Sequence, residues 1–246
     1  MYIPTILTKR QSSTNTAAIA AITPTKDQRT TLYIIFAYIA FILIVWNIPY
    51  LKHILYPFKL VTVAFHEFSH AFAGVLTGAK IVSIKIDPNE GGLTVMRGGF
   101  WWFTMPAGYL GSSFIGALMI LAGFNITASK VVSVIIILCL LATLFWANNW
   151  LTRIITFLFI AIIIALWVLF QAKGLKYFVL FMGVMSCFYS LWDIVEDLVT
   201  RKVHQSDATL FAEQTGFPSQ CCGVIWLFIS FLFFASGIML GIILFK

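Results

Sequence analysis

The sequence predicts an all-α polytopic membrane protein with about seven transmembrane helices and one short β-hairpin at the membrane face. Its 246 residues are 61% hydrophobic and only 10% charged, which leaves too little polar surface to coat a soluble globule. Most of the apolar residues fall in runs near the ~20 residues that a bilayer requires. The net charge of +7 comes from Lys and Arg in short segments between these runs, where they set topology, so we expect no nucleic-acid partner.

A polar segment opens the chain. Residues 1–30 are rich in Ser, Thr and Ala, carry four basic residues against one acidic residue, and lack the continuous apolar core of a cleavable signal peptide. We expect this segment to be a disordered tail on the cytosolic side of the membrane. Residues 31–246 then form a single transmembrane domain.

Seven apolar runs follow the tail, and each predicts one membrane span. They cover residues 31–49, 55–77, 101–123, 131–147, 150–170, 177–198 and 223–245. The fourth run is short, and only Asn148-Asn149 separates it from the fifth. These two runs are expected to form either a tight helical hairpin or a re-entrant pair, which would reduce the number of spans to six. A polar loop at about 199–222 precedes the last run.

The second run contains His66-Glu67-Phe68-Ser69-His70. On a helix, His66 and His70 lie one turn apart on the same face, so their imidazoles are able to share one metal ion at about 2.0–2.1 Å. Glu67 then stands beside the metal, where it acts as general base toward water in zinc metalloproteases with this spacing. The alternative is a pair of buried, hydrogen-bonded histidines. Because ionisable residues inside a membrane are costly, we favour the catalytic interpretation.

A catalytic zinc ion usually takes three protein ligands, and no other histidine lies within a predicted span. Carboxylates lie at the end of the sixth run, where burial of an unpaired charge would cost free energy. In the seven-span arrangement the second and sixth helices run in the same direction, which brings Asp193 to nearly the depth of His70. Asp193 is therefore the predicted third ligand, and Asp197, one turn outward, is the alternative.

The residues after the motif predict a β-hairpin at about 80–97. Apolar and polar residues alternate from Ile81 to Ile86 and from Leu93 to Met96, with turn-forming residues between them. The edge of such a hairpin is able to hold a substrate in extended form, so Ile84, Asn89 and Val95 are candidates for substrate positioning. A passive interfacial loop is the alternative. In the third run, Gly108, Gly111 and Gly116 predict a small-residue face for close helix packing.

Three segments together resemble the M50B-like branch of the site-2 protease family. These are the histidine motif, residues 77–92 from Thr77-Gly78-Ala79-Lys80 to Glu90-Gly91-Gly92, and Pro106-Ala107-Gly108-Tyr109-Leu110-Gly111. The likeness extends more loosely over 185–213, including Ser206-Asp207-Ala208. It implies an intramembrane zinc metalloprotease with His66 and His70 as ligands and Glu67 as base. Well-studied members take their third ligand from a Leu-Asp-Gly motif, which carries that role to Asp193, although Ile194 stands where those members have Gly.

The leading functional prediction is therefore hydrolysis of a peptide bond in a membrane-embedded protein substrate, with zinc-activated water and Glu67 as general base. Two other classes are weighed against it. A catalytically silent membrane scaffold would not need Glu67, so the presence of this residue argues against that class. A proton- or ion-coupled transporter would use the histidines and carboxylates as a pathway, but the chain shows no internal repeat or paired broken helices.

Overall fold

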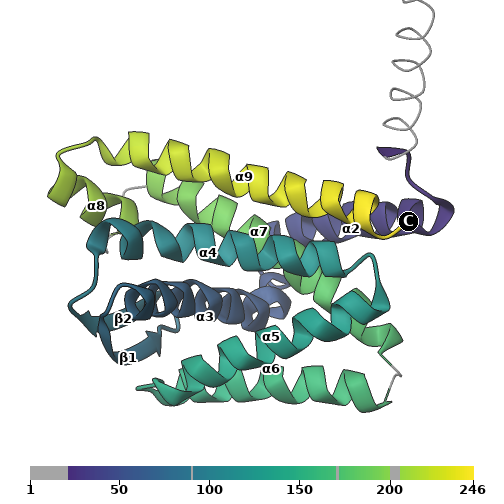
Figure 1. The fold of residues 1–246 in the computed structure, drawn as a ribbon, viewed down its shortest axis with the longest axis horizontal. Helices are drawn as coiled ribbons and strands as arrows, with labels where there is room; N and C mark the ends of the chain where they lie inside the picture. The colour runs from purple at the N-terminus through teal and green to yellow at the C-terminus, as the bar shows by residue number, and fades with distance from the viewer. Residues whose placement is uncertain (1–21, 90, 170–171, 200–205) are drawn as a thin grey trace, which may run out of the picture.

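The computed structural model describes residues 22–89, 91–169, 172–199 and 206–246, without the side chains of 197–199. This part of the chain forms eight helices and one two-stranded antiparallel sheet (Figure 1). The elements are α2 (Lys26–Asn47), α3 (Lys52–Leu76), β1 (Lys80–Ile86), β2 (Gly92–Arg97), α4 (Trp101–Ala122), α5 (Ile126–Phe145), α6 (Trp150–Leu169), α7 (Lys173–Val199), α8 (Asp207–Thr215) and α9 (Ser219–Leu244).

Six of the described helices are long and apolar enough to cross a membrane, which confirms the prediction of a multi-pass helical protein. They are α2, α4, α5, α6, α7 and α9. The fourth and fifth predicted runs form two separate helices of 20 residues each, α5 and α6, joined as a tight hairpin. The helix of the second run, α3, does not reach the same hydropathy because it carries the histidine motif and two lysines.

Helix α2 begins inside the segment predicted as tail. Thr25 and Gln28 form a capping box, in which each side chain accepts a hydrogen bond from the backbone N–H of the other. The Gln28 amide also donates to the backbone oxygen of Ile242, which ties the start of α2 to the end of α9. Residues 26–30 are therefore helical, and residues 1–21 lie outside the described part of the chain.

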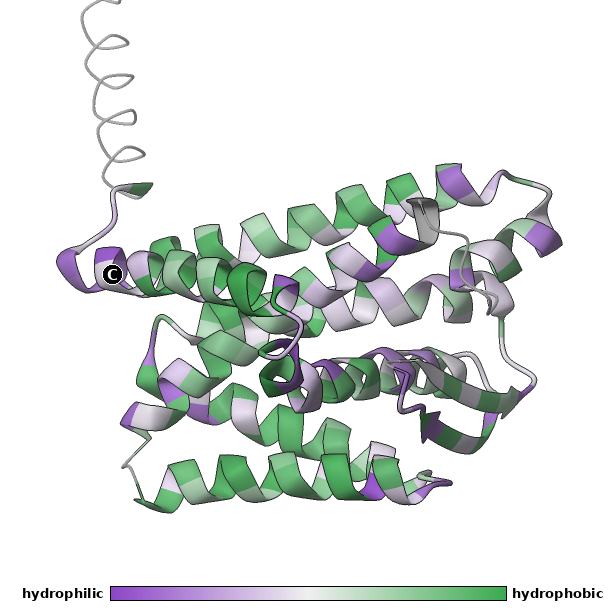
Figure 2. Ribbon diagram, turned by 180° about the vertical axis from the view of Figure 1, so that it is seen from behind, coloured by the Kyte–Doolittle hydropathy of each residue, from purple (hydrophilic) through white to green (hydrophobic). Residues whose placement is uncertain are grey.

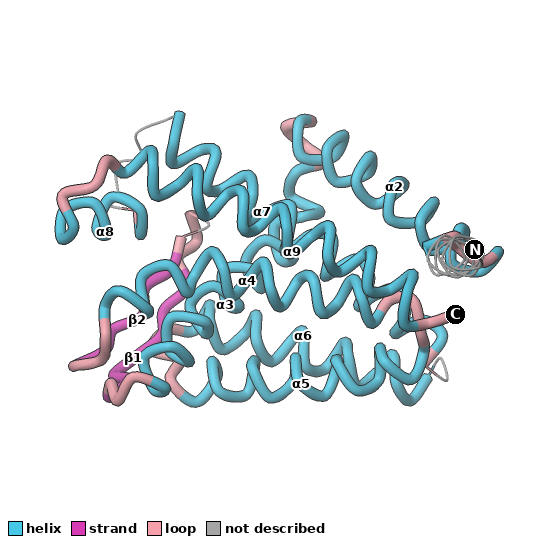
Figure 3. Tube along the Cα trace, turned by 45° about the horizontal axis from the view of Figure 1, so that its top comes forward, coloured by secondary structure: helices cyan, strands magenta, loops and turns pink. Residues whose placement is uncertain are grey.

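Helix α3 occupies the centre of the molecule. Figure 1 shows it between the pair α5 and α6 on one side and the layer of α4, α7 and α9 on the other, and Figure 3 shows the same arrangement from above. Leu60, Val61, Ala64 and Phe65 are fully or almost fully buried in the main core. Figure 2 shows mostly hydrophobic residues along α6 and α9. The outer helices thus present apolar surface to the membrane and enclose the more polar α3.

The predicted hairpin is present and lies at one end of the helices (Figure 1). Gly78, in the left-handed region with a φ of 83°, ends α3 and turns the chain into β1. Ile84 pairs with Thr94 and Ile86 with Gly92. The hairpin tip is held to α3 because the Tyr56 hydroxyl donates to the Pro88 carbonyl at 2.8 Å. The strands therefore lie alongside the histidine helix.

The outer edge of β1 is already covered by the connection between α5 and α6. The N–H of Ile84 donates to the Trp146 carbonyl at 2.8 Å, and the Ile84 carbonyl accepts from the N–H of Asn148 at 2.9 Å. Ile86 makes equivalent bonds to the side chains of Thr152 and Asn149. In an antiparallel pair, partners that do not bond each other both turn their backbone groups outward. The N–H and C=O groups of Thr94 and Gly92 therefore point away from β1, outward from the other edge of the sheet.

Candidate metal centre

The motif histidines meet in the interior of the molecule, on the face of α3 that is turned to α4. Their Nε2 atoms are 3.0 Å apart, and their side chains are only 16% and 11% exposed for His66 and His70. The helical repeat places them on one face, as the spacing predicted. The Tyr109 ring packs edge-to-face on His66 with ring centroids 4.8 Å apart, which restricts the orientation of that imidazole.

A carboxylate reaches both imidazoles from a distant part of the chain. Oδ2 of Asp207 lies 2.9 Å from Nε2 of His66 and 3.1 Å from Nε2 of His70. Burial acts to raise the pKa of the Asp207 carboxyl, but the charge of His70 and the hydrogen bonds from both imidazoles outweigh it and hold that pKa below the usual range. Asp207 is therefore ionised, which is the form that binds metal.

Helix α8 holds Asp207 in place. The Ser206 side chain accepts from the N–H of Thr209 and caps the helix, so that Asp207 is its first residue. Phe211, one turn later, packs against Trp101 and Trp102 of α4 and Trp226 of α9, with centroids 5.4–5.7 Å apart. These aromatic contacts fix α8 over the end of α4 and aim its first residue at the histidines.

The donor set fits a zinc ion. One carboxylate oxygen and two imidazole nitrogens form a triangle with sides of 2.9–3.1 Å. Tetrahedral zinc with bonds of about 2.0–2.1 Å separates its ligand atoms by about 3.3 Å, so a small expansion accommodates the ion. Nδ1 of His70 lies 2.7 Å from the Thr104 carbonyl, which only accepts. Nδ1 therefore carries a hydrogen, and in the neutral imidazole, which is the form that binds metal, the lone pair is on Nε2.

Gly108 of α4 faces the same three atoms. A Cβ at this position would lie 2.3 Å from Nε2 of His66 and 2.4 Å from Nε2 of His70. Gly111 and Gly116 stand at close helix contacts, against Ser69 and Cys187, as the small-residue face predicted. Gly108 differs from them because its missing side chain makes room for the two imidazole nitrogens, which approach the backbone of α4 at this point.

Glu67 lies beside the histidines and under the hairpin. The Thr94 hydroxyl is 2.7 Å from Oε2 of Glu67 and 3.0 Å from its backbone oxygen. A Cβ on Gly92 would lie 2.3 Å from Oε1 of Glu67, so this glycine makes room for the carboxylate. Glu67, His70 and Asp207 line a cavity of about 320 Å³ together with Gly92, Leu93 and Thr94 of β2 and the first turns of α4. This cavity gives access from the β2 edge to the metal-binding atoms.

The structure brings together His66, Glu67 and His70, as the spacing predicted, and it adds Asp207, which was not among the predicted ligands. The carboxylate on both imidazoles is that of Asp207 and not that of Asp193, which lies half-buried on α7. The prediction of Asp193 assumed that the third ligand came from the sixth span, whereas the carboxylate that contacts the imidazoles belongs to α8. The side chain of Asp197 lies outside the described residues.

The structure also bears on the three residues that were predicted to position the substrate. Ile84 is fully buried and its backbone groups are engaged, so it is not on a free edge. Asn89 lies in the turn away from Glu67, and Val95 is 39% exposed on the outward face of β2. Sequence reasoning missed the positions of Thr94 and Gly92 beside Glu67 and of Gly108 at the imidazole nitrogens. Residues 199–222 were predicted as a polar loop, whereas Asp207–Thr215 form α8; Ser206 followed by Asp207 is a helix N-cap signal from which the start of this helix could have been predicted, although not its place in space.

Comparison with known proteins gives one match. The family model described as Peptidase M50B-like matches residues 35–237, a range that contains His66, Glu67, His70 and Asp207 and most of the helices. No curated protein and no solved structure matches the chain.

We predict that Asp207→Asn strongly lowers the zinc bound per molecule, because the amide is a poorer ligand and carries no charge to balance the ion. Asp193→Asn is the matched control and should retain zinc near the wild-type level. The measurement is metal content of the purified protein by mass spectrometry. Loss of zinc in Asp193→Asn with retention in Asp207→Asn would restore the assignment to α7.

We also predict that Gly108→Ala weakens zinc binding by roughly tenfold or more, because the added methyl group takes the space at the two Nε2 atoms. Gly116→Ala serves as control, since its methyl group would strike α7 and not the histidines. It should lower the melting temperature while the folded fraction keeps its zinc. Equal zinc affinity in wild type and Gly108→Ala would place the ion elsewhere.

Proposed function

The chain belongs to the peptidase M50B-like family, and from this premise we propose that it is an intramembrane zinc metalloprotease that hydrolyses a peptide bond of a membrane-embedded protein. The observation that carries the proposal is the convergence of two imidazole nitrogens and the Asp207 carboxylate with Glu67 beside them. His66, His70 and Asp207 would hold the zinc ion. The family supports a protease in general, and the geometry supports this particular chemistry.

Zinc bound at this position would supply a Lewis acid that polarises water and the substrate carbonyl. Glu67 accepts a proton from the water as it attacks the peptide carbon, and then delivers the proton to the leaving amine. Thr94 donates to the Glu67 carboxylate and sets its direction. The imidazole of His70 keeps its orientation through the Thr104 carbonyl.

The outer edge of β2 is where we place the substrate. The backbone groups of Gly92 and Thr94 point along this edge, and both residues touch the cavity that contains Glu67. A substrate segment that has lost its helical structure needs partners for its N–H and C=O groups inside the membrane. Addition to β2 as a strand would supply those partners and bring a peptide bond beside Glu67.

The direct test is Glu67→Gln in purified protein reconstituted in lipid vesicles with a panel of single-span reporter proteins. We expect about one zinc per chain in both forms and cleavage only by the wild type, because the amide keeps the shape of the side chain but does not accept the proton. His66→Ala and His70→Ala should lose zinc as well as activity. Zinc binding without cleavage of any reporter by the wild type would favour the silent scaffold instead.

A second test concerns Thr94. Thr94→Val removes the hydroxyl that orients Glu67, and we expect turnover to fall by about tenfold or more with zinc content unchanged, as for loss of a hydrogen bond to a charged group. Thr94→Ser keeps the hydroxyl and should retain most activity. Zinc content and initial cleavage rates measure the two effects separately. Equal rates for Val and Ser would show that the contact to Glu67 has no part in catalysis.

A further inference from the structure

The β-hairpin has one face turned to α3 and one turned away from it. Thr94 and Met96 belong to the first face, since Thr94 contacts Glu67 and Met96 approaches Gly74. Side chains alternate along a strand, and directly paired residues share a face. The other face therefore carries Lys80, Ser83 and Lys85 of β1 opposite Arg97, Val95 and Leu93 of β2. We call it the outer face of the hairpin, and all of these residues except Ser83 are exposed.

Two cations of the outer face lie directly opposite each other at the base of the hairpin. Lys80 pairs with Arg97 in the register, a position in which Cβ atoms are about 4.5–5.5 Å apart. The base is held closed because the N–H of Phe100 donates to the Thr77 hydroxyl at 3.1 Å. Like charges in this position repel, and within the described part of the chain neither side chain has a hydrogen bond or an ion pair. An anion bound between them would relieve the repulsion.

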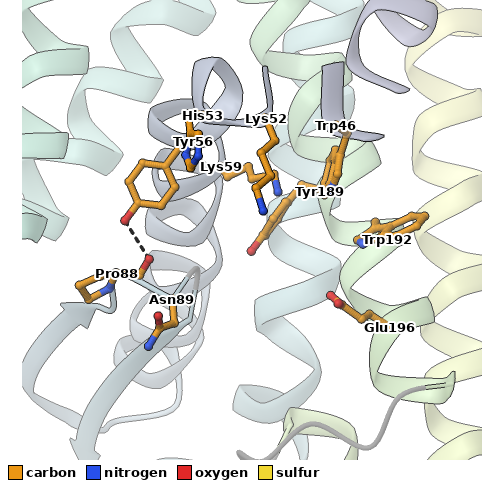
Figure 4. A pocket seen from close by; sticks show the side chains of 10 residues that line it. All are labelled: Trp46, Lys52, His53, Tyr56, Lys59, Pro88, Asn89, Tyr189, Trp192 and Glu196. Carbon is orange, nitrogen blue, oxygen red and sulfur yellow. Dashed lines mark hydrogen bonds between the residues drawn. The ribbon is translucent and has the colours of Figure 1, made fainter. Parts of the chain in front are cut away.

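Carboxylates stand near the other end of the hairpin, its tip. From the pair of cations to the last pair of the ladder, β1 advances by six residues, which corresponds to about 20 Å. At the tip, the carboxylate of Asp87 is 3.9 Å from Nζ of Lys85. Figure 4 shows Glu196 of α7 across a cavity from Pro88 and Asn89 of the turn. The charge of the hairpin is thus divided between a cationic base and a tip that has carboxylates beside it.

The base of the hairpin is joined closely to a membrane-spanning helix. Only residues 98–100 separate β2 from α4, whose length and hydropathy suit a membrane span. Large side chains are exposed around this junction, namely Leu76 at the end of α3 and Phe100, Trp102 and Phe103 at the start of α4. Aromatic side chains gather at the level of the lipid headgroups, so the two cations lie at that level as well.

We propose that the base of the outer face binds the phosphate of an anionic phospholipid headgroup through Lys80 and Arg97. The planar guanidinium of Arg97 matches two phosphate oxygens, and Lys80 adds a second charge from the opposite strand. The exposed apolar side chains beside the pair favour a lipid over free phosphate, because they give the acyl chains a surface to contact. The inference is independent of the proposed proteolytic function. It adds a consequence for it, since a lipid bound here would hold the strand that carries Thr94.

The test is lipid binding to the purified full chain in detergent, counted by native mass spectrometry. The chain is titrated with phosphatidylglycerol and with phosphatidylcholine of the same acyl chains. We expect the first phosphatidylglycerol to bind about tenfold or more tightly than phosphatidylcholine, with the preference falling as salt is added. Lys80→Gln and Arg97→Gln should each reduce the preference by about fivefold, and the double variant should abolish it. Equal binding of the two lipids by the wild type would overturn the proposal.

Lys130→Gln is the matched control. Lys130 is also exposed, but it lies in the first turn of α5, at the opposite end of α4 and about 33 Å away along that helix. This variant should keep the wild-type preference for phosphatidylglycerol. A loss as large as that in Lys80→Gln would mean that any cation near the membrane contributes equally, and the assignment to the hairpin would be wrong.

Melting temperatures in lipid nanodiscs separate lipid binding from a structural role. Because removal of one of two opposed like charges relieves repulsion, Lys80→Gln in phosphatidylcholine should melt at or slightly above the wild-type temperature. Phosphatidylglycerol should raise the melting temperature of the wild type more than that of the variant. Equal destabilisation of the variant in both lipids would refute the proposal. Tighter binding of a soluble polyglutamate peptide than of phosphatidylglycerol, lost in both variants, would overturn it in favour of an acidic protein segment.

Discussion

The cost of placing ionisable groups inside a membrane governs this structure. Helix α3 carries the two motif imidazoles, the Glu67 carboxylate and the buried Lys59, and none of these groups is stable when turned to hydrocarbon. The six apolar helices meet this requirement because they surround the middle of α3, where most of residues 59–71 are buried. His66, His70 and Glu67 are also largely shielded from solvent by this burial, which strengthens electrostatic interactions at the proposed metal centre.

The centre is built from one local pattern and several long-range contacts. The helical repeat alone places His66, Glu67 and His70 on adjoining faces. Asp207 comes from a short helix 141 residues further along the chain than His66, and Thr94 from a strand 27 residues beyond Glu67. Packing of α4 against α3 requires Gly108 at the point of closest approach. Function therefore depends on the correct docking of α8 and the hairpin as much as on the motif itself.

The sequence was sufficient to predict whatever depends on local periodicity. Apolar runs located the helices, alternation located the hairpin, and the spacing of His66 and His70 located the centre of the site. It was insufficient for Asp207, because the place of this residue depends on the packing of α8 against α4 and α9, which no local periodicity in the sequence encodes. The small residues of α4 predicted close helix packing, but not that Gly108 in particular would face the two imidazoles, because small residues have the same pattern on a helix whatever they face.

The covered edge of β1 limits what the hairpin is able to bind. A two-stranded ribbon with both edges open would extend in two directions, and copies of the protein in one membrane would be able to join through their hairpins into a continuous sheet. The backbone bonds from Ile84 to Trp146 and Asn148 close one side. With only the β2 edge left, copies of this chain would be able to join at most in pairs, edge to edge, and a continuous sheet of many copies cannot form.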